Sequence, residues 1–118
     1  MSTILVVDDE SNMRFMLRLI LETAGHDVAE APHGAAALAH AQQSPPDVIV
    51  TDLMMPVMNG RELIERLRAD PATAGIPIVV VSANPRAPLP DADARIGKPF
   101  EPDTLIETVR SLTENEAA

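Results

Sequence analysis

Polar residues that could do chemistry together stand directly after short apolar runs of the sequence. Asp8 and Asp9 follow the first run, and Asp52 follows a later one. Ser82 and Lys98 follow the last two runs, and Lys98 is the single lysine of the chain. Three carboxylates, an ammonium and a hydroxyl are the groups that a phosphoryl site with a divalent cation uses.

The chemistry of such a set depends on the three carboxylates meeting in one place. Crowded carboxylates repel each other, and one of them could take up a proton. A divalent cation with oxygen ligands, such as Mg²⁺, would relieve the repulsion and leave room for a phosphate. The residues therefore predict a phosphoryl site with an aspartate as nucleophile. No glycine-rich phosphate loop occurs, so no nucleotide is implied.

The elements that must position these residues alternate between two periodicities. Short apolar runs predict strands at Ile4–Val7, Asp27–Ala31, Val48–Val50, Ile76–Val81 and around Ile96. Helical spacing predicts helices between Ser11 and Gly25, over His33–Gln43, over Asn59–Ala69, and from Pro102 to Leu112. This alternation predicts an α/β fold, a doubly wound five-stranded parallel sheet with helices on both faces. Ligands of such sheets bind outside the carboxyl ends of the strands.

Composition bounds the class of protein. The 118 residues suit one domain, over 1–118, with a polar tail at Thr113–Ala118 that we expect to fray. The net charge of −9 argues against nucleic acid and against an anionic membrane surface as partners. The absence of cysteine excludes thiolate catalysis and zinc–thiolate sites. Without a membrane or signal segment, the expected location is the cytoplasm.

Four motifs carry a resemblance to a known family. They are VVDDE at 6–10, DLMMPVMNG at 52–60, SA at 82–83 and KPF at 98–100. Together and in this order they resemble the receiver domain of bacterial two-component response regulators, of the stand-alone type similar to the chemotaxis regulator. The resemblance covers essentially the whole chain. It implies a flavodoxin-like sheet with strand order 2-1-3-4-5.

The resemblance also implies roles for the acidic residues. Asp52 would accept a phosphoryl group from a phosphohistidine of a sensor histidine kinase or phosphotransfer protein. Asp9, Asp52 and the backbone carbonyl of Met54 would bind Mg²⁺, or Mn²⁺, directly, with Asp8 helping through water. The phosphorylated protein would then signal to a downstream protein target.

Further roles follow from the same resemblance. Lys98 would pair with the phosphoryl group, and the peptide before Pro99 would be cis. Ser82 would supply the hydroxyl that moves toward the phosphate. Gly60 would permit the turn that opens the third helix.

Two features depart from the family pattern. Arg95 stands three positions before the lysine, where receivers usually have an aromatic switch residue. The segment from Ser82 to Lys98 is short and contains three prolines within 85–90. Regular helix is incompatible with that spacing, so we expect helix 4 to be missing or severely shortened. The phosphorylation site is then intact, whereas the usual output face is not.

Other interpretations remain open at this stage. Asp8 and Asp9 could simply favour a helix N-terminus, Ser82 could be a loop hydroxyl, and Lys98 a surface lysine. The chain could also be a binding module that works without phosphorylation. A phosphatase with an aspartyl nucleophile is a third possibility, but the second acid that such enzymes commonly place two residues later is replaced by Met54.

Overall fold

The computed structural model describes residues 2–55, 58–83 and 92–117 of the chain. Five strands form one sheet in the order β2-β1-β3-β4-β5, and every neighbouring pair is parallel. The predicted architecture and strand order are thus confirmed. The strands are β1 (Thr3–Val7), β2 (Asp27–Ala31), β3 (Val48–Asp52), β4 (Ile78–Ser82) and β5 (Ala94–Gly97).

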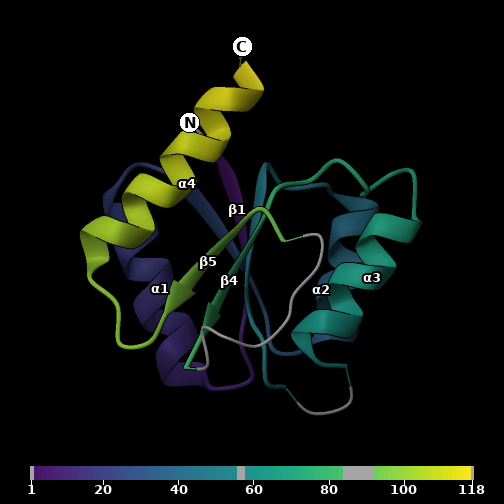
Figure 1. Cartoon of the computed structure of the whole chain (residues 1–118), viewed down its shortest axis with the longest axis horizontal. Helices are drawn as coiled ribbons and strands as arrows, with labels where there is room; N and C mark the ends of the chain where they lie inside the picture. Colours follow the sequence, from purple (N-terminus) through teal and green to yellow (C-terminus); the bar gives the residue numbers. More distant parts are fainter. Residues whose placement is uncertain (1, 56–57, 84–91, 118) are drawn as a thin grey trace.

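Helices cover both faces of the sheet. Those within the described ranges are α1 (Ser11–Thr23), α2 (Gly34–Gln43), α3 (Gly60–Ala69) and α4 (Pro102–Ala117). Helices α1 and α4 lie on one face, and α2 and α3 lie on the other (Figure 1). No helix in the described part of the chain combines the length and the apolar content that a membrane span requires.

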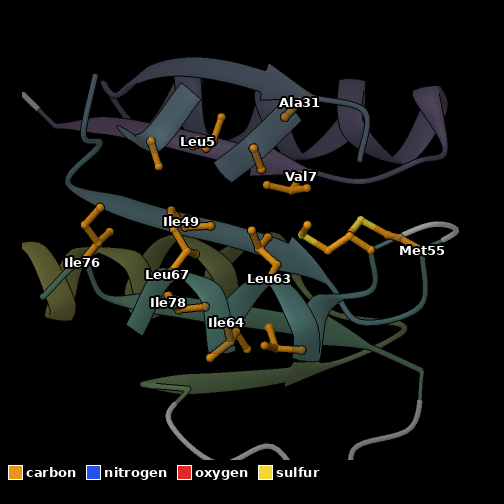
Figure 2. Packing of buried hydrophobic residues seen from close by; sticks show 14 of the residues in the cluster. Leu5, Val7, Ala31, Ile49, Met55, Leu63, Ile64, Leu67, Ile76 and Ile78 are labelled. Carbon is orange, nitrogen blue, oxygen red and sulfur yellow. The ribbon is translucent and has the colours of Figure 1, made fainter. Parts of the chain in front are cut away.

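The core is divided by the sheet into two apolar clusters. Side chains that alternate along each strand point to opposite faces, so Val79 and Val80 belong to different clusters. On one face Leu5 and Ile49 pack against Leu63 and Leu67 of α3 (Figure 2). All residues of β3 and β4 are buried, because a parallel strand in the centre of such a sheet is covered on both sides.

Two sequence expectations concern the C-terminal third of the chain. Helix α4 continues to Ala117 and so includes residues 113–117 of the tail that we expected to fray. That stretch contains no Gly or Pro that would stop a helix. The proline-rich segment expected to replace a helix between β4 and β5 falls on residues 84–91, outside the described residues. The helix labelled α4 follows β5.

Hydrogen bonds around Arg68 of α3 join the loop that precedes β4 to the residue that precedes β5. The Nη1 atom of Arg68 donates to the carbonyl oxygens of Ala74 and Ile76, at 2.8 and 2.7 Å. Its Nη2 atom donates to Asp93 Oδ2 at 2.7 Å, and the same oxygen accepts the Ile78 N–H at 2.7 Å. One guanidinium therefore holds the α3–β4 loop against the start of β5.

Replacing Arg68 by Met should reduce the free energy of unfolding by about 1–3 kcal/mol, because two carbonyls and a carboxylate each lose one hydrogen-bond donor. Urea denaturation followed by far-UV circular dichroism measures this, since the chain has no Trp or Tyr for fluorescence. The matched control is Arg66→Met, which removes an exposed pair with Glu62 at 3.4 Å and should cost less than about 0.5 kcal/mol. Equal losses in the two variants would contradict the structural role given to Arg68.

Candidate functional site

The polar residues singled out in the sequence come together at the carboxyl ends of three central strands and of the edge strand β5. Asp8 directly follows β1, Asp52 is the last residue of β3, and Ser82 is the last residue of β4. Lys98 directly follows β5. The register pairs Asp52 with Val81 and Ser82 with Gly97, so these strand ends stand at a common edge.

Lys98 forms an ion pair with Asp52. The Lys98 Nζ atom lies 3.3 Å from Asp52 Oδ1, and both side chains are largely buried. The backbone N–H of Leu53 donates to the same Oδ1 atom at 2.9 Å. Lys98 is itself held in place because its backbone N–H donates to the Ser82 carbonyl at 2.9 Å. The one lysine of the chain is therefore aimed at the one carboxylate that ends a central strand.

Three carboxylates crowd at this edge. Asp8, Asp9 and Asp52 each offer an oxygen, and these atoms all lie within 4.8 Å of one another. Asp8 is only 2% exposed, whereas Asp9 is exposed. Oxygen donors at this density are the ligand set that Mg²⁺ and Mn²⁺ prefer, so the residues present fit a hard divalent cation.

The electrostatics of Asp8 reflect this crowding. Burial raises the pKa of Asp8 above its usual value, and the negative charges of Asp52 and Asp9 raise it further. The Glu10 N–H, which donates to Asp8 Oδ1 at 2.9 Å, and the Lys98 ammonium act in the opposite direction. Without a cation the ionised form of Asp8 is therefore disfavoured in the folded protein.

Asp8→Asn should stabilise the metal-free protein, because the amide keeps an oxygen for the Glu10 N–H and removes a buried charge. We expect the melting temperature at neutral pH to rise by about 4 °C, the shift that roughly 1 kcal/mol produces in a small domain. Since the folded-state pKa is raised, the difference should shrink as the pH falls toward the ordinary value of 3.8. The control is Asp27→Asn, which replaces an exposed carboxylate at the start of β2 and should leave the melting temperature unchanged. A lower melting temperature in Asp8→Asn would contradict the view that burial and the charges of Asp9 and Asp52 disfavour the ionised Asp8.

Gly60 supports the site in a way that differs from the expectation. Gly25, not Gly60, has a positive φ, so Gly60 does not need a left-handed turn conformation. A Cβ atom at Gly60 would instead lie 2.5 Å from the Asp52 carbonyl oxygen and 2.8 Å from Leu53 Cα. The Gly60 N–H also donates to the Leu53 carbonyl at 2.8 Å. The start of α3 thus packs directly on the backbone of Asp52.

The other predicted site residues differ in their burial and in their place in the sheet. Ser82 is buried at the edge, and Met54 is 76% exposed in the loop two residues after Asp52. The Lys98–Pro99 peptide is cis, the isomer that the resemblance implied. Arg95 pairs with Val80 inside the sheet, two residues before the strand ends.

Two residues at the site were not anticipated from the sequence. Arg14 of α1 donates from Nη1 to the Asp8 carbonyl at 2.7 Å and from Nε to Glu30 Oε1 at 2.9 Å. The available signal was that the two arginines at positions 14 and 18 are the only polar residues between Met13 and Leu21 of α1, and that β2 contains one glutamate.

A doubly wound sheet with an acidic cluster and a lysine at its carboxyl edge is the arrangement that the sequence motifs implied. Residues 4–110 match the family described as response regulator receiver domain, and the chain belongs to this family. Receiver domains are signalling domains that histidine kinases or phosphotransfer proteins phosphorylate, and they bind Mg²⁺ at an acidic pocket.

Several relatives are similar over nearly the whole chain. Protein PilH of Pseudomonas aeruginosa is 32% identical, with 95% of this chain and 98% of PilH covered. The solved structure of chemotaxis response regulator CheY4 of Vibrio cholerae has a TM-score of 0.87 and 33% identity over 95% of this chain and 98% of that one. The receiver domain of Francisella response regulator 1452 has a TM-score of 0.90 and 30% identity, covering 98% and 99%.

Other relatives are longer. DNA-binding response regulator MtrA of Mycolicibacterium smegmatis is 38% identical over 96% of this chain, which spans 51% of MtrA. The chain thus matches nearly all of PilH but about half of MtrA.

Proposed function

We propose that this protein is a cytoplasmic response-regulator receiver, formed by residues 1–118 as one domain, that accepts a phosphoryl group on Asp52. The donor would be a phosphohistidine of a sensor histidine kinase or phosphotransfer protein. The phosphorylated domain would then change its affinity for a downstream protein. The observation that carries the proposal is the buried Asp52 carboxylate, which lies 3.3 Å from Lys98 Nζ within a cluster of three acids.

The proposed reaction is a displacement at phosphorus. A carboxylate oxygen of Asp52 attacks the phosphorus atom, a P–O bond forms, and the P–N bond to the donor imidazole breaks with its electron pair staying on nitrogen. Lys98 is proposed to pair its ammonium with a phosphoryl oxygen as negative charge develops, and its distance of 3.3 Å from Asp52 Oδ1 supports this role. Ser82, at the end of the neighbouring strand, is proposed to donate its hydroxyl to another phosphoryl oxygen.

The cation would be held by the acidic cluster. We assign Asp9, Asp52 and the Met54 carbonyl as direct ligands, and Asp8 as a ligand through water, for Mg²⁺ or Mn²⁺. When bound, the cation would neutralise charge on the carboxylates and on the incoming phosphoryl oxygens. Asp8 supports this assignment, because burial and, to a smaller extent, the charges of Asp52 and Asp9 raise its pKa, and a bound cation would favour the ionised carboxylate.

The direct test is phosphorylation by a small donor with a P–N bond, phosphoramidate, in the presence of Mg²⁺. Intact-mass spectrometry should detect the addition of one phosphoryl group, and peptide mapping after borohydride reduction should place it at Asp52. Chelation of the cation should abolish the modification. Labelling of another residue, or labelling that persists without a divalent cation, would overturn the proposal.

A second candidate is a receiver that binds its partner without phosphorylation. Arg95 supports this alternative, because a cation in β5 stands where receivers usually have the aromatic residue that couples phosphorylation to output. The test is a partner pull-down with wild type and Asp52→Asn. Equal capture by both proteins would favour this alternative, and capture that depends on phosphorylation would exclude it.

A further inference from the structure

Arg14 connects residues 8–10, which we call the acidic loop, to the neighbouring strand β2. Its Nη1 atom donates to the Asp8 carbonyl at 2.7 Å, and its Nε atom donates to Glu30 Oε1 at 2.9 Å. Glu30 belongs to β2, and the next residue, Ala31, accepts the Asp8 N–H at 3.2 Å. We propose that Arg14, anchored by Glu30, is a positioning residue that holds the Asp8–Asp9 peptide in its cation-binding geometry. This inference rests on the proposed function.

The Asp8 carbonyl is an effective place from which to control both acids. It belongs to the peptide that links Asp8 to Asp9, and that peptide is a rigid plane. Fixing the carbonyl therefore restricts the backbone on both sides, and with it the directions of the two carboxylates. The opposite side of Asp8 is also fixed, because its N–H and its Oδ1 atom bond to Ala31 and Glu10.

Repulsion makes this restraint necessary. The oxygens of Asp8, Asp9 and Asp52 lie within 4.8 Å of one another, so the loop that carries the first two would gain by moving away from the third. A cation can bind tightly only if the protein holds these oxygens close before the cation arrives. Residues that orient metal ligands in this way commonly change metal affinity by about 10–100-fold when mutated.

The contacts of Arg14 suit this task better than those of a lysine would. The two donors leave one planar guanidinium in different directions, so a single side chain can bridge a carbonyl and a carboxylate. The Arg14 and Glu30 side chains are 18% and 26% exposed. Hydrogen bonds from Arg18 and Arg14 lower the pKa of Glu30, so the anchor stays ionised at neutral pH.

Arg18 provides a matched control on the same helix. Its Nη1 atom bonds Glu30 Oε2 at 2.7 Å, so it shares the anchor with Arg14. Its other contact is with Glu22 at 3.1 Å, and the structure gives it no bond to the acidic loop. A purely structural link between α1 and β2 would depend on both arginines, whereas control of the acidic loop depends on Arg14 alone.

The experiment is a Mg²⁺ titration of the full chain, followed by the amide signals of residues 8–10 and 53, with thermal melts of each protein. Arg14→Met should weaken Mg²⁺ binding about tenfold. Arg18→Met should stay within about twofold of wild type, because an exposed ion pair contributes little. Equal Mg²⁺ affinities in all three proteins would overturn the inference.

A second variant separates position from charge and remains informative if Arg14→Met does not fold. Arg14→Lys keeps the cation but cannot bridge both acceptors, so its Mg²⁺ affinity should stay reduced several-fold. Full affinity in this variant would show that charge alone matters and would overturn the positioning role. A wild-type protein that binds no Mg²⁺ would instead overturn the proposed function.

Discussion

Asp52→Asn should abolish the response of the protein to beryllofluoride or acetyl phosphate in the presence of Mg²⁺. The variant keeps the size of the side chain and an oxygen for the Leu53 N–H, but it lacks the anionic oxygen that attacks phosphorus. Because the Leu53 N–H donates to Asp52 Oδ1 at 2.9 Å, its amide signal should be a direct reporter. Wild type should show a new Leu53 signal at saturation, and Asp52→Asn should show none.

The control for this experiment is Asp27→Asn, which removes one carboxylate from the start of β2. It should respond as wild type does, which would exclude a general effect of net charge. An unchanged response in Asp52→Asn would mean that another residue accepts the phosphoryl group. The absence of any response in wild type with saturating Mg²⁺ would remove the basis of the proposed function.

The second large effect is expected for Gly60→Ala. The new methyl group would lie 2.5 Å from the Asp52 carbonyl oxygen and 2.8 Å from Leu53 Cα. Both are backbone atoms, which cannot rotate away as the end of a long side chain can. The loop between β3 and α3 must therefore shift, at a cost of about 2 kcal/mol in the free energy of unfolding. The shift should also move Asp52 relative to Lys98 and slow its phosphorylation by acetyl phosphate.

Gly75→Ala is the matched control for that substitution. Nothing lies within 4 Å of the Cβ position at Gly75, and its φ is not in the left-handed region. The control should therefore be as stable as wild type, or more stable by about 0.4–1 kcal/mol, because alanine restricts the unfolded chain. Urea denaturation and phosphorylation rates of the three proteins measure both effects. If Gly60→Ala matches Gly75→Ala in both, the close packing on Asp52 is unimportant.

The strands and their parallel pairing could be predicted because they follow from repeated patterns, whereas the order of the strands was implied by the family resemblance. Short runs such as Ile4–Val7 and Val48–Val50 are apolar at every position, which is typical of parallel strands covered on both faces. The predicted neighbours β1 and β3 then bring Asp8 and Asp52 to one edge. Lys98 was expected at the same ends of the strands because it follows the last predicted strand. Its ion pair with Asp52 agrees with that expectation.

Contacts between one side chain and one backbone atom could not be predicted. The Asp8 carbonyl that Arg14 binds has no signature in the sequence, because every residue carries the same acceptor. The same holds for the carbonyls of Ala74 and Ile76 that Arg68 binds. The reason for Gly60 was also missed, because close approach of two backbone segments depends on tertiary packing, whereas a turn is a local property.

The cluster around Asp93 has a consequence for how the chain can change. Asp93 exchanges two hydrogen bonds with Ile78, from its N–H to the Ile78 carbonyl at 2.9 Å and from the Ile78 N–H to its carboxylate at 2.7 Å. These two bonds extend the β4–β5 pairing to the residue just before β5. The hydrogen bond from the Lys98 N–H to the Ser82 carbonyl extends it to the residue just after β5. Hydrogen bonds at both ends of β5 thus fix the position of Lys98 along the strand direction. Insertions or deletions between Ala83 and Ala92 should therefore leave Lys98 paired with Asp52.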